Sequence, residues 1–220
     1  MKKKKIFIAC DTTNLNKVKK IIKLTKSSKI KIGYKFGLEF MNSKHGRIFV
    51  SKLKNKIIFI DLKLNDTVNT MLSTVKALKD LRINYLTVHI SSGLSALKAV
   101  KKVSRSIKII GVTTLTSLNN NDLKLIGYNK SVKKLVLHQA KLAKKANLDA
   151  LVCSPHEVSA VRKIFKKEII TPGVQIRKRN FDQKRSMEAR DVKSDWLVIG
   201  RAITHGNIKK NIQNLLKELR

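Results

Sequence analysis

The sequence predicts an α/β protein in the form of a (β/α)8 barrel, with a single domain spanning residues 1–220. Three observations lead to this fold class. Apolar, β-rich runs recur eight times at fairly even spacing, and lysine-rich segments with helical periodicity lie between most of them. The first run leads into Cys10-Asp11-Thr12-Thr13 without a glycine, whereas an open doubly wound sheet usually carries a Gly-rich turn at this point.

The eight runs are short and mostly unalternating, which is typical of parallel strands buried on both faces. In chain order they cover residues 6–10, 29–33, 57–62, 85–90, 108–115, 150–154, 169–174 and 196–200. Helical spacing is clearest for Leu15, Val18, Ile21, Ile22 and Leu24, for Leu135, Leu142 and Ala146, and for Ile208, Ile212, Leu215 and Leu216. No linker, repeat or low-complexity block interrupts this alternation.

The composition limits the class of protein. A hydrophobic fraction of 42% over 220 residues is enough for a full core and argues against a disordered polycation. No run of 18 uncharged apolar residues occurs, so we expect no membrane partner. The two cysteines, Cys10 and Cys153, do not form a disulfide framework and are expected to pack as small apolar residues. We therefore expect a soluble, cytoplasmic protein.

The formal net charge of +35 has two interpretations. A surface this basic attracts polyanions and is common in nucleic-acid-binding proteins. However, the bases are 39 Lys and only 10 Arg, a bias that an AT-rich genome produces, and aromatic residues do not interleave with the lysines. We favour compositional drift and expect no specific nucleic-acid partner.

Polar residues gather at the ends of the predicted strands, where (β/α)8 barrels carry their chemistry. They are Asp11, Lys31, Asp61, Lys63, Asp66, His89, Thr116, Ser117, Gly200 and Arg201. Three of only 14 acidic residues fall in this set, which is more than random placement gives. His89 either contacts a substrate or packs as a hydrogen-bonded core histidine, and we favour the second.

The segment D-x-K-x-x-D at residues 61–66 suggests a reaction site. Asp61 and Lys63 are two residues apart on a strand and are expected to point to the same side. Carboxylates on either side keep Lys63 protonated, so it can serve as a fixed proton donor. Such an array suits a reaction that creates negative charge on carbon. A simple ion pair at a strand end remains the alternative for this segment alone.

Together with its neighbours, the segment resembles the signature of the orotidine 5′-monophosphate decarboxylase family, with Thr70 four residues after the last aspartate. The similarity runs nearly end to end. It includes Ala9-Cys10-Asp11, Lys31-Ile32-Gly33, Val112-Thr113-Thr114-Leu115-Thr116-Ser117, Val152-Cys153-Ser154-Pro155, Thr171-Pro172-Gly173-Val174, Asp182-Gln183-Lys184-Arg185 and Ile199-Gly200-Arg201. These motifs are individually weak to moderate, but their order along the chain makes the resemblance strong.

The resemblance implies a role for each matching residue. Lys63 would donate a proton to C6 of the pyrimidine, Asp61 would lie against the substrate carboxylate, and Lys31 and Asp66 would complete the charged array. Asp66 would reach into the neighbouring subunit, which implies a homodimer with shared sites. The substrate-binding set would be Asp11 and Thr70 at the ribose, Lys31 and Asp61 in the charged array, Thr116 or the neighbouring Ser117 at the pyrimidine edge, and Gln183, Gly200 and Arg201 at the phosphate.

One departure from the family pattern affects the phosphate site. The family usually reads T-P-G-I-R, whereas this chain has Gln175 where the arginine is expected and Arg177 two residues later. Either Arg177 takes over the phosphate contact, which we favour, or Arg201 and Gln183 suffice.

We expect no cofactor and no metal, because the five histidines are scattered and no flavin or nicotinamide fingerprint occurs. Two alternatives stay open at this point. Related sugar-phosphate decarboxylases and aldolases also carry D-x-K-x-x-D, generally with a metal, and a basic nucleic-acid-binding protein is supported by the charge alone.

Overall fold

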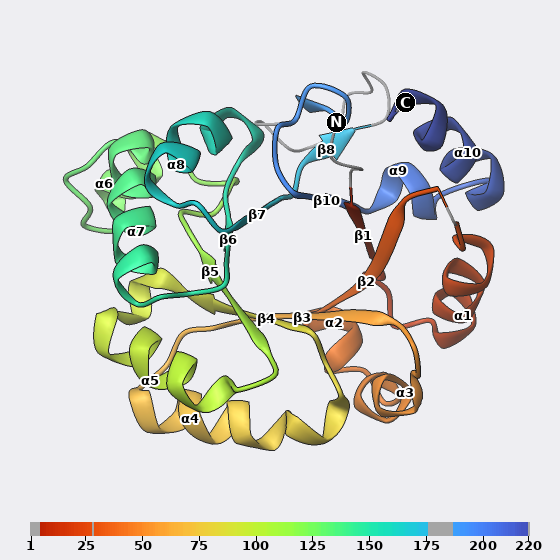
Figure 1. Ribbon diagram of the computed structural model, residues 1–220, viewed down its shortest axis with the longest axis horizontal. Coiled ribbons are helices and arrows are strands. Elements are labelled where there is room, and N and C mark those ends of the chain that lie inside the picture. The colour runs from red at the N-terminus through yellow and green to blue at the C-terminus, as the bar shows by residue number, and fades with distance from the viewer. Residues whose placement is uncertain (1–4, 28, 176–186, 220) are drawn as a thin grey trace.

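The computed structural model describes residues 5–27, 29–175 and 187–219. Eight parallel strands close into a barrel in the order β1-β10-β7-β6-β5-β4-β3-β2, and helices surround it (Figure 1). The barrel strands are β1 (Lys5–Ala9), β2 (Lys31–Gly37), β3 (Ile57–Leu64), β4 (Tyr85–His89), β5 (Lys108–Val112), β6 (Ala150–Val152), β7 (Glu168–Thr171) and β10 (Trp196–Ile199). The (β/α)8 prediction is confirmed.

Helices follow most strands, as the periodicity predicts. They are α1 (Leu15–Leu24), α2 (Leu38–Met41), α3 (Gly46–Lys52), α4 (Val68–Ala77), α5 (Leu94–Ser104), α6 (Asn120–Leu125), α7 (Val132–Lys145), α8 (Val158–Ile164), α9 (Arg201–Thr204) and α10 (Ile208–Glu218). Short 3₁₀ helices cover Lys79–Leu81, Ile90–Ser92 and Pro155–Glu157, and a two-stranded sheet pairs β8 (Val174–Gln175) with β9 (Met187–Glu188). Within the described ranges, no helix is both long and apolar enough to cross a bilayer.

The core has two layers, because consecutive residues of each strand point to opposite sides of the barrel wall. Outward-facing residues such as Ile6, Ile8 and Ile58 pack against the helices. Inward-facing residues fill the barrel, where the ring of Phe7 stacks on Trp196 with centroids 4.1 Å apart. The barrel is therefore closed by side chains below its mouth.

Glu168, at the start of β7, joins side chains at the amino-terminal end of the barrel. Its carboxylate accepts hydrogen bonds from Lys5 (2.7 Å), Tyr85 (2.9 Å), Lys108 (3.0 Å) and Trp196 (3.1 Å). Burial opposes ionisation of Glu168, but these donors lower its pKa to about 2. This network ties five strands, β1, β4, β5, β7 and β10, together at the end of the barrel opposite the mouth.

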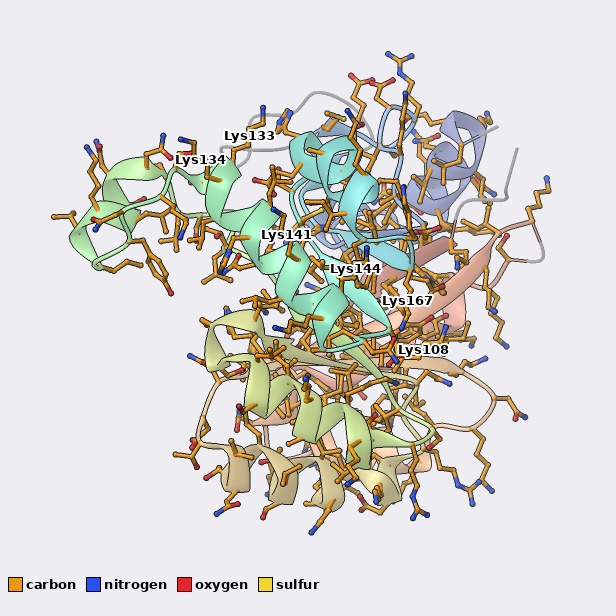
Figure 2. The ribbon with its side chains drawn as sticks, turned by 60° about the vertical axis from the view of Figure 1, so that its left-hand side comes forward. Lys108, Lys133, Lys134, Lys141, Lys144 and Lys167 are labelled. Atoms are coloured by element: carbon orange, nitrogen blue, oxygen red, sulfur yellow. The ribbon has the colours of Figure 1, made fainter. Side chains whose placement is uncertain are left out.

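The lysines of α7 lie on its exposed side. Lys133, Lys134, Lys141 and Lys144 project from this helix, and Lys167 and Lys108 continue the line beyond its end (Figure 2). The buried residues of the same helix, among them Leu135 and Val136, face the barrel. The excess positive charge thus lies on a solvated helix face here, as we expected.

Candidate active site

A cavity of about 410 Å³ opens at the carboxyl ends of the barrel strands. Its charged lining residues are Asp11, Lys35, Asp61, Lys63 and Arg201, and they come from the ends of β1, β2, β3 and β10. Apolar strand residues and the threonines after β5 line the rest. A concave site of this volume, with few polar groups converging on it, is typical of small-molecule binding.

Four of these side chains form a continuous chain of ion pairs. The Lys35 ammonium lies 2.9 Å from Asp11 Oδ1 and 3.3 Å from Asp61 Oδ2. Lys63 Nζ lies 3.0 Å from the same Oδ2 of Asp61. Negative and positive groups therefore alternate along the mouth, so the array can oppose a substrate anion at one point and supply a proton at the next.

The array keeps its members charged. Burial opposes ionisation of Asp61, but Lys35, Lys63 and a hydrogen bond from Thr87 outweigh it and lower the pKa of this carboxyl. Burial likewise disfavours the Lys35 ammonium, but Asp61 and Asp11 raise its pKa above the ordinary value. Asp61 is consequently ionised and Lys35 protonated throughout the neutral range.

The prediction that Lys31 belongs to this array is wrong. Lys31 is the exposed first residue of β2 and pairs in register with Lys5 at the amino-terminal end of the barrel. Lys35 occupies the array instead, four residues and about 13 Å further along the strand. The predicted strand, residues 29–33, ended too early because Lys35 interrupts the apolar run, although the observed β2 continues to Gly37.

A repeated motif could have revealed Lys35. β2 contains K-x-G twice, at Lys31-Ile32-Gly33 and at Lys35-Phe36-Gly37, and only the second borders the site. A Cβ atom on Gly37 would lie 3.0 Å from Asp11 Oδ1 and 3.4 Å from Lys35 Nζ, so this glycine makes room for the ion pair. A Cβ atom on Gly33 would instead meet the ring of Phe7 inside the barrel.

Strand β3 is irregular where Asp61 and Lys63 lie. Ile60 pairs with Leu86 and Leu64 with Val88, so the three intervening residues of β3 face one residue of β4, Thr87. The Asp61 and Lys63 side chains meet as predicted, but a bulge rather than regular strand alternation brings them together. Lys63 has φ +50°, a left-handed conformation uncommon for a residue with a side chain.

Asp66 and Thr70 lie beyond the end of β3, outside the cavity lining. Both are exposed. Asp66 Oδ1 accepts the backbone N–H of Thr67 at 2.6 Å, and the Thr67 and Thr70 hydroxyls lie 3.1 Å apart. Asp66 and Thr70 therefore lie apart from the array within the described residues of this chain.

Thr116, Gly200 and Arg201 line the cavity, at the side of it formed after β5 and β10. Gly200 precedes the short helix α9, whose first residue is Arg201. Their contacts with a ligand stay a prediction. The predicted binding residues Arg177 and Gln183 lie outside the described residues.

Three buried or half-buried groups near the mouth have shifted pKa values. Burial and Lys63 outweigh Asp61 and lower the pKa of His89, which is not among the residues lining the cavity. Burial raises the pKa of the Cys10 thiol to about 12 and also raises that of Cys153. Both cysteines are free and buried, so the expectation that they pack as small apolar residues is confirmed.

Fold and site together define a (β/α)8-barrel protein with an alternating acid–base array at its mouth. Residues 4–211 match the model of the orotidine 5′-phosphate decarboxylase / HUMPS family. The chain therefore belongs to this family, and the relatives below group it with the carboxy-lyases.

Named relatives cover nearly the whole chain. It is 40% identical to the orotidine 5′-phosphate decarboxylase of Wolbachia pipientis from Culex pipiens, over 97% of this chain and 98% of that protein. It is 39% identical to the Ehrlichia canis enzyme of the same name, over 90% of each chain. Among solved structures, the orotidine 5′-phosphate decarboxylase from Lactobacillus acidophilus matches with a TM-score of 0.83 and 27% identity, over 99% of each chain.

Proposed function

We propose that this protein decarboxylates orotidine 5′-monophosphate to uridine 5′-monophosphate in de novo pyrimidine biosynthesis, in the cytoplasm. Family membership supports the substrate, and one observation carries the chemistry: Lys63 and Lys35 both contact the buried carboxylate of Asp61 at the cavity. This pairing supplies a fixed anion and a proton donor next to each other.

In the proposed reaction, the substrate carboxylate lies against Asp61, whose negative charge disfavours the bound carboxylate more than the departing carbon dioxide. The bond between C6 and the carboxylate carbon breaks, and its electron pair stays on C6. Lys63 then transfers a proton from Nζ to C6 and is reprotonated from solvent. Lys35 holds Asp61 and Asp11 in place and offsets their mutual repulsion.

The proposed chemistry requires no cofactor or metal ion, so the rate must come from the array and from binding of the remote phosphate. Gly200 and Arg201 border the cavity on the side where such barrels commonly bind phosphate. We keep Gln183 and Arg177 as proposed phosphate contacts on the basis of the sequence. If Arg177 replaces the usual arginine, then Arg177→Ala should raise KM.

The proposed enzyme is a homodimer that shares its two sites. Asp66 is exposed in the single chain, and the exposed apolar side chains of Leu38 and Val68 follow β2 and β3 on the same side of the barrel. An apolar surface beside the mouth fits a symmetric interface that brings Asp66 to the partner's array. Thr70, on the first turn of α4 near Asp66, would contact the ribose in the same assembly.

An ultraviolet assay tests the activity. Purified protein should deplete orotidine 5′-monophosphate at the same rate with and without a chelator, whereas a metal-dependent sugar-phosphate enzyme would lose its own activity with the chelator. No loss of orotidine 5′-monophosphate at micromolar enzyme would reject the proposed function.

A further inference from the structure

Thr87, in the middle of β4, hydrogen-bonds to two members of the array, Asp61 and Lys63, without lining the cavity. Its side chain is fully buried and is not among the residues lining the cavity. The Thr87 hydroxyl donates a hydrogen bond to Asp61 Oδ1 at 3.0 Å. The same oxygen accepts the backbone N–H of Lys63 at 2.9 Å. A hydroxyl has one donor and two acceptor positions, so both bonds form at once.

The pairing of β3 with β4 explains why a side chain is needed here. In a regular parallel ladder, the Lys63 N–H would bond to a backbone carbonyl of the neighbouring strand. Three β3 residues face Thr87 alone, so the ladder is interrupted and the threonine hydroxyl takes the place of that carbonyl. The bond holds Lys63 at φ +50°, a conformation that persists only where surrounding contacts fix it.

We propose that Thr87 is a positioning residue that fixes the proton donor and the anion of the array relative to each other. The inference rests on the proposed function of Lys63 and Asp61. Thr87 touches neither substrate nor reacting atoms and acts only through these two residues. Its hydroxyl locks the backbone of Lys63 and the carboxylate of Asp61 to one point, so that Nζ and Oδ2 meet at 3.0 Å.

The main test compares Thr87→Val, which keeps the branched shape, with Thr87→Ser, which keeps the hydroxyl. We expect Thr87→Val to lower kcat roughly 10- to 100-fold, because a small displacement of reacting groups has effects of this size. KM should stay within about threefold, because Thr87 does not reach the cavity. The acid limb of kcat should move to higher pH, because Asp61 loses a hydrogen bond that favours its charged form. Thr87→Ser should restore most of kcat and the original acid limb.

Thr25→Val is the matched control. Thr25 is equally buried at the C-terminal end of α1 and does not line the cavity; its hydroxyl donates to the Ile21 carbonyl at 2.7 Å and lies 3.1 Å from the Tyr34 hydroxyl. This variant should lower the melting temperature but leave kcat and the acid limb unchanged. Equal kcat values and equal acid limbs for Thr87→Val and Thr87→Ser would overturn the proposal.

A stability cycle tests the same proposal without any substrate. Glycine adopts positive φ freely, so Lys63→Gly should relieve the strain that the Thr87 bond holds. Thr87→Val should then lower the melting temperature less in the Lys63→Gly background than in the wild-type background. If Thr87→Val does not fold by itself, recovery of folding in the Lys63→Gly background supports the proposal, and failure in both backgrounds overturns it. The two proposals can fail separately. If the wild-type protein shows no turnover but the effects of Thr87→Val and Lys63→Gly on the melting temperature are coupled, the proposed function is rejected and the positioning role of Thr87 stands.

Discussion

The ammonium group of Lys35 lies 3.3 Å from Asp61 Oδ2, deep in the mouth of the barrel. This contact makes Asp61 the link between the two lysines of the array, since Lys63 Nζ lies 3.0 Å from the same oxygen. The contact also shows that Lys35, and not the predicted Lys31, belongs to the array, because Lys31 lies at the opposite end of the same strand.

Lys35→Ala should therefore lower kcat by at least about 100-fold, since Asp61 and Asp11 lose the cation between them. Lys31→Ala is the matched control on the same strand and should keep kcat within about twofold. Steady-state kinetics with orotidine 5′-monophosphate measures both. A larger loss for Lys31→Ala than for Lys35→Ala would contradict the placement of the array.

The fold was predictable because most of the strands are uninterrupted apolar runs. The number and order of such runs define the barrel even where the predicted ends of a strand are wrong by a few residues. The array was only partly predictable. Lys35 lies inside β2, but a lysine in an apolar run predicts the end of a strand. Its partners are Asp61 on β3 and Asp11 just after β1, and no local pattern connects them to Lys35. In the sequence, Thr87 looks like an ordinary β-branched strand residue. Its role depends on a bulge in the neighbouring strand β3, and no local sequence pattern predicts that bulge.

Asp66 tests the shared site through subunit complementation. Lys63→Ala and Asp66→Asn should each be nearly inactive as homodimers. Mixing them with subunit exchange should restore about a quarter of wild-type activity, because half of the dimers are then hybrids and each hybrid has one intact site. A mixture no more active than its components, although mass spectrometry detects hybrid dimers, would contradict sharing.

Glu168 predicts a pH dependence of stability. Its pKa is lowered to about 2 in the fold, so its contribution is complete above its ordinary value of 4.5 and is lost as the pH falls from there toward 2. The size is at most about 3 kcal/mol, since one pKa unit corresponds to about 1.4 kcal/mol and solvent screens this partly exposed carboxylate. Urea unfolding of wild type and Glu168→Gln should show a difference that shrinks over this interval. A difference that stays constant down to pH 2.5 would show that the carboxylate charge contributes nothing.

The net charge of +35 should affect substrate capture and leave the chemistry unchanged. Because the proposed substrate is an anion, kcat/KM should fall as ionic strength rises, while kcat stays constant. Orotidine, which lacks the phosphate, serves as the control and should show a weaker dependence. If kcat/KM depends equally on ionic strength for the two compounds, the surface charge does not assist capture of the phosphate-bearing substrate.

Lys63 provides the most direct test of the proposed activity. Lys63→Ala should lower kcat by more than about a thousandfold, because it removes the proposed proton donor for C6. Binding of uridine 5′-monophosphate, measured by calorimetry, should remain detectable, since the phosphate side of the cavity is intact. A Lys63→Ala enzyme that keeps most of its turnover would contradict the assignment of Lys63 as the proton donor.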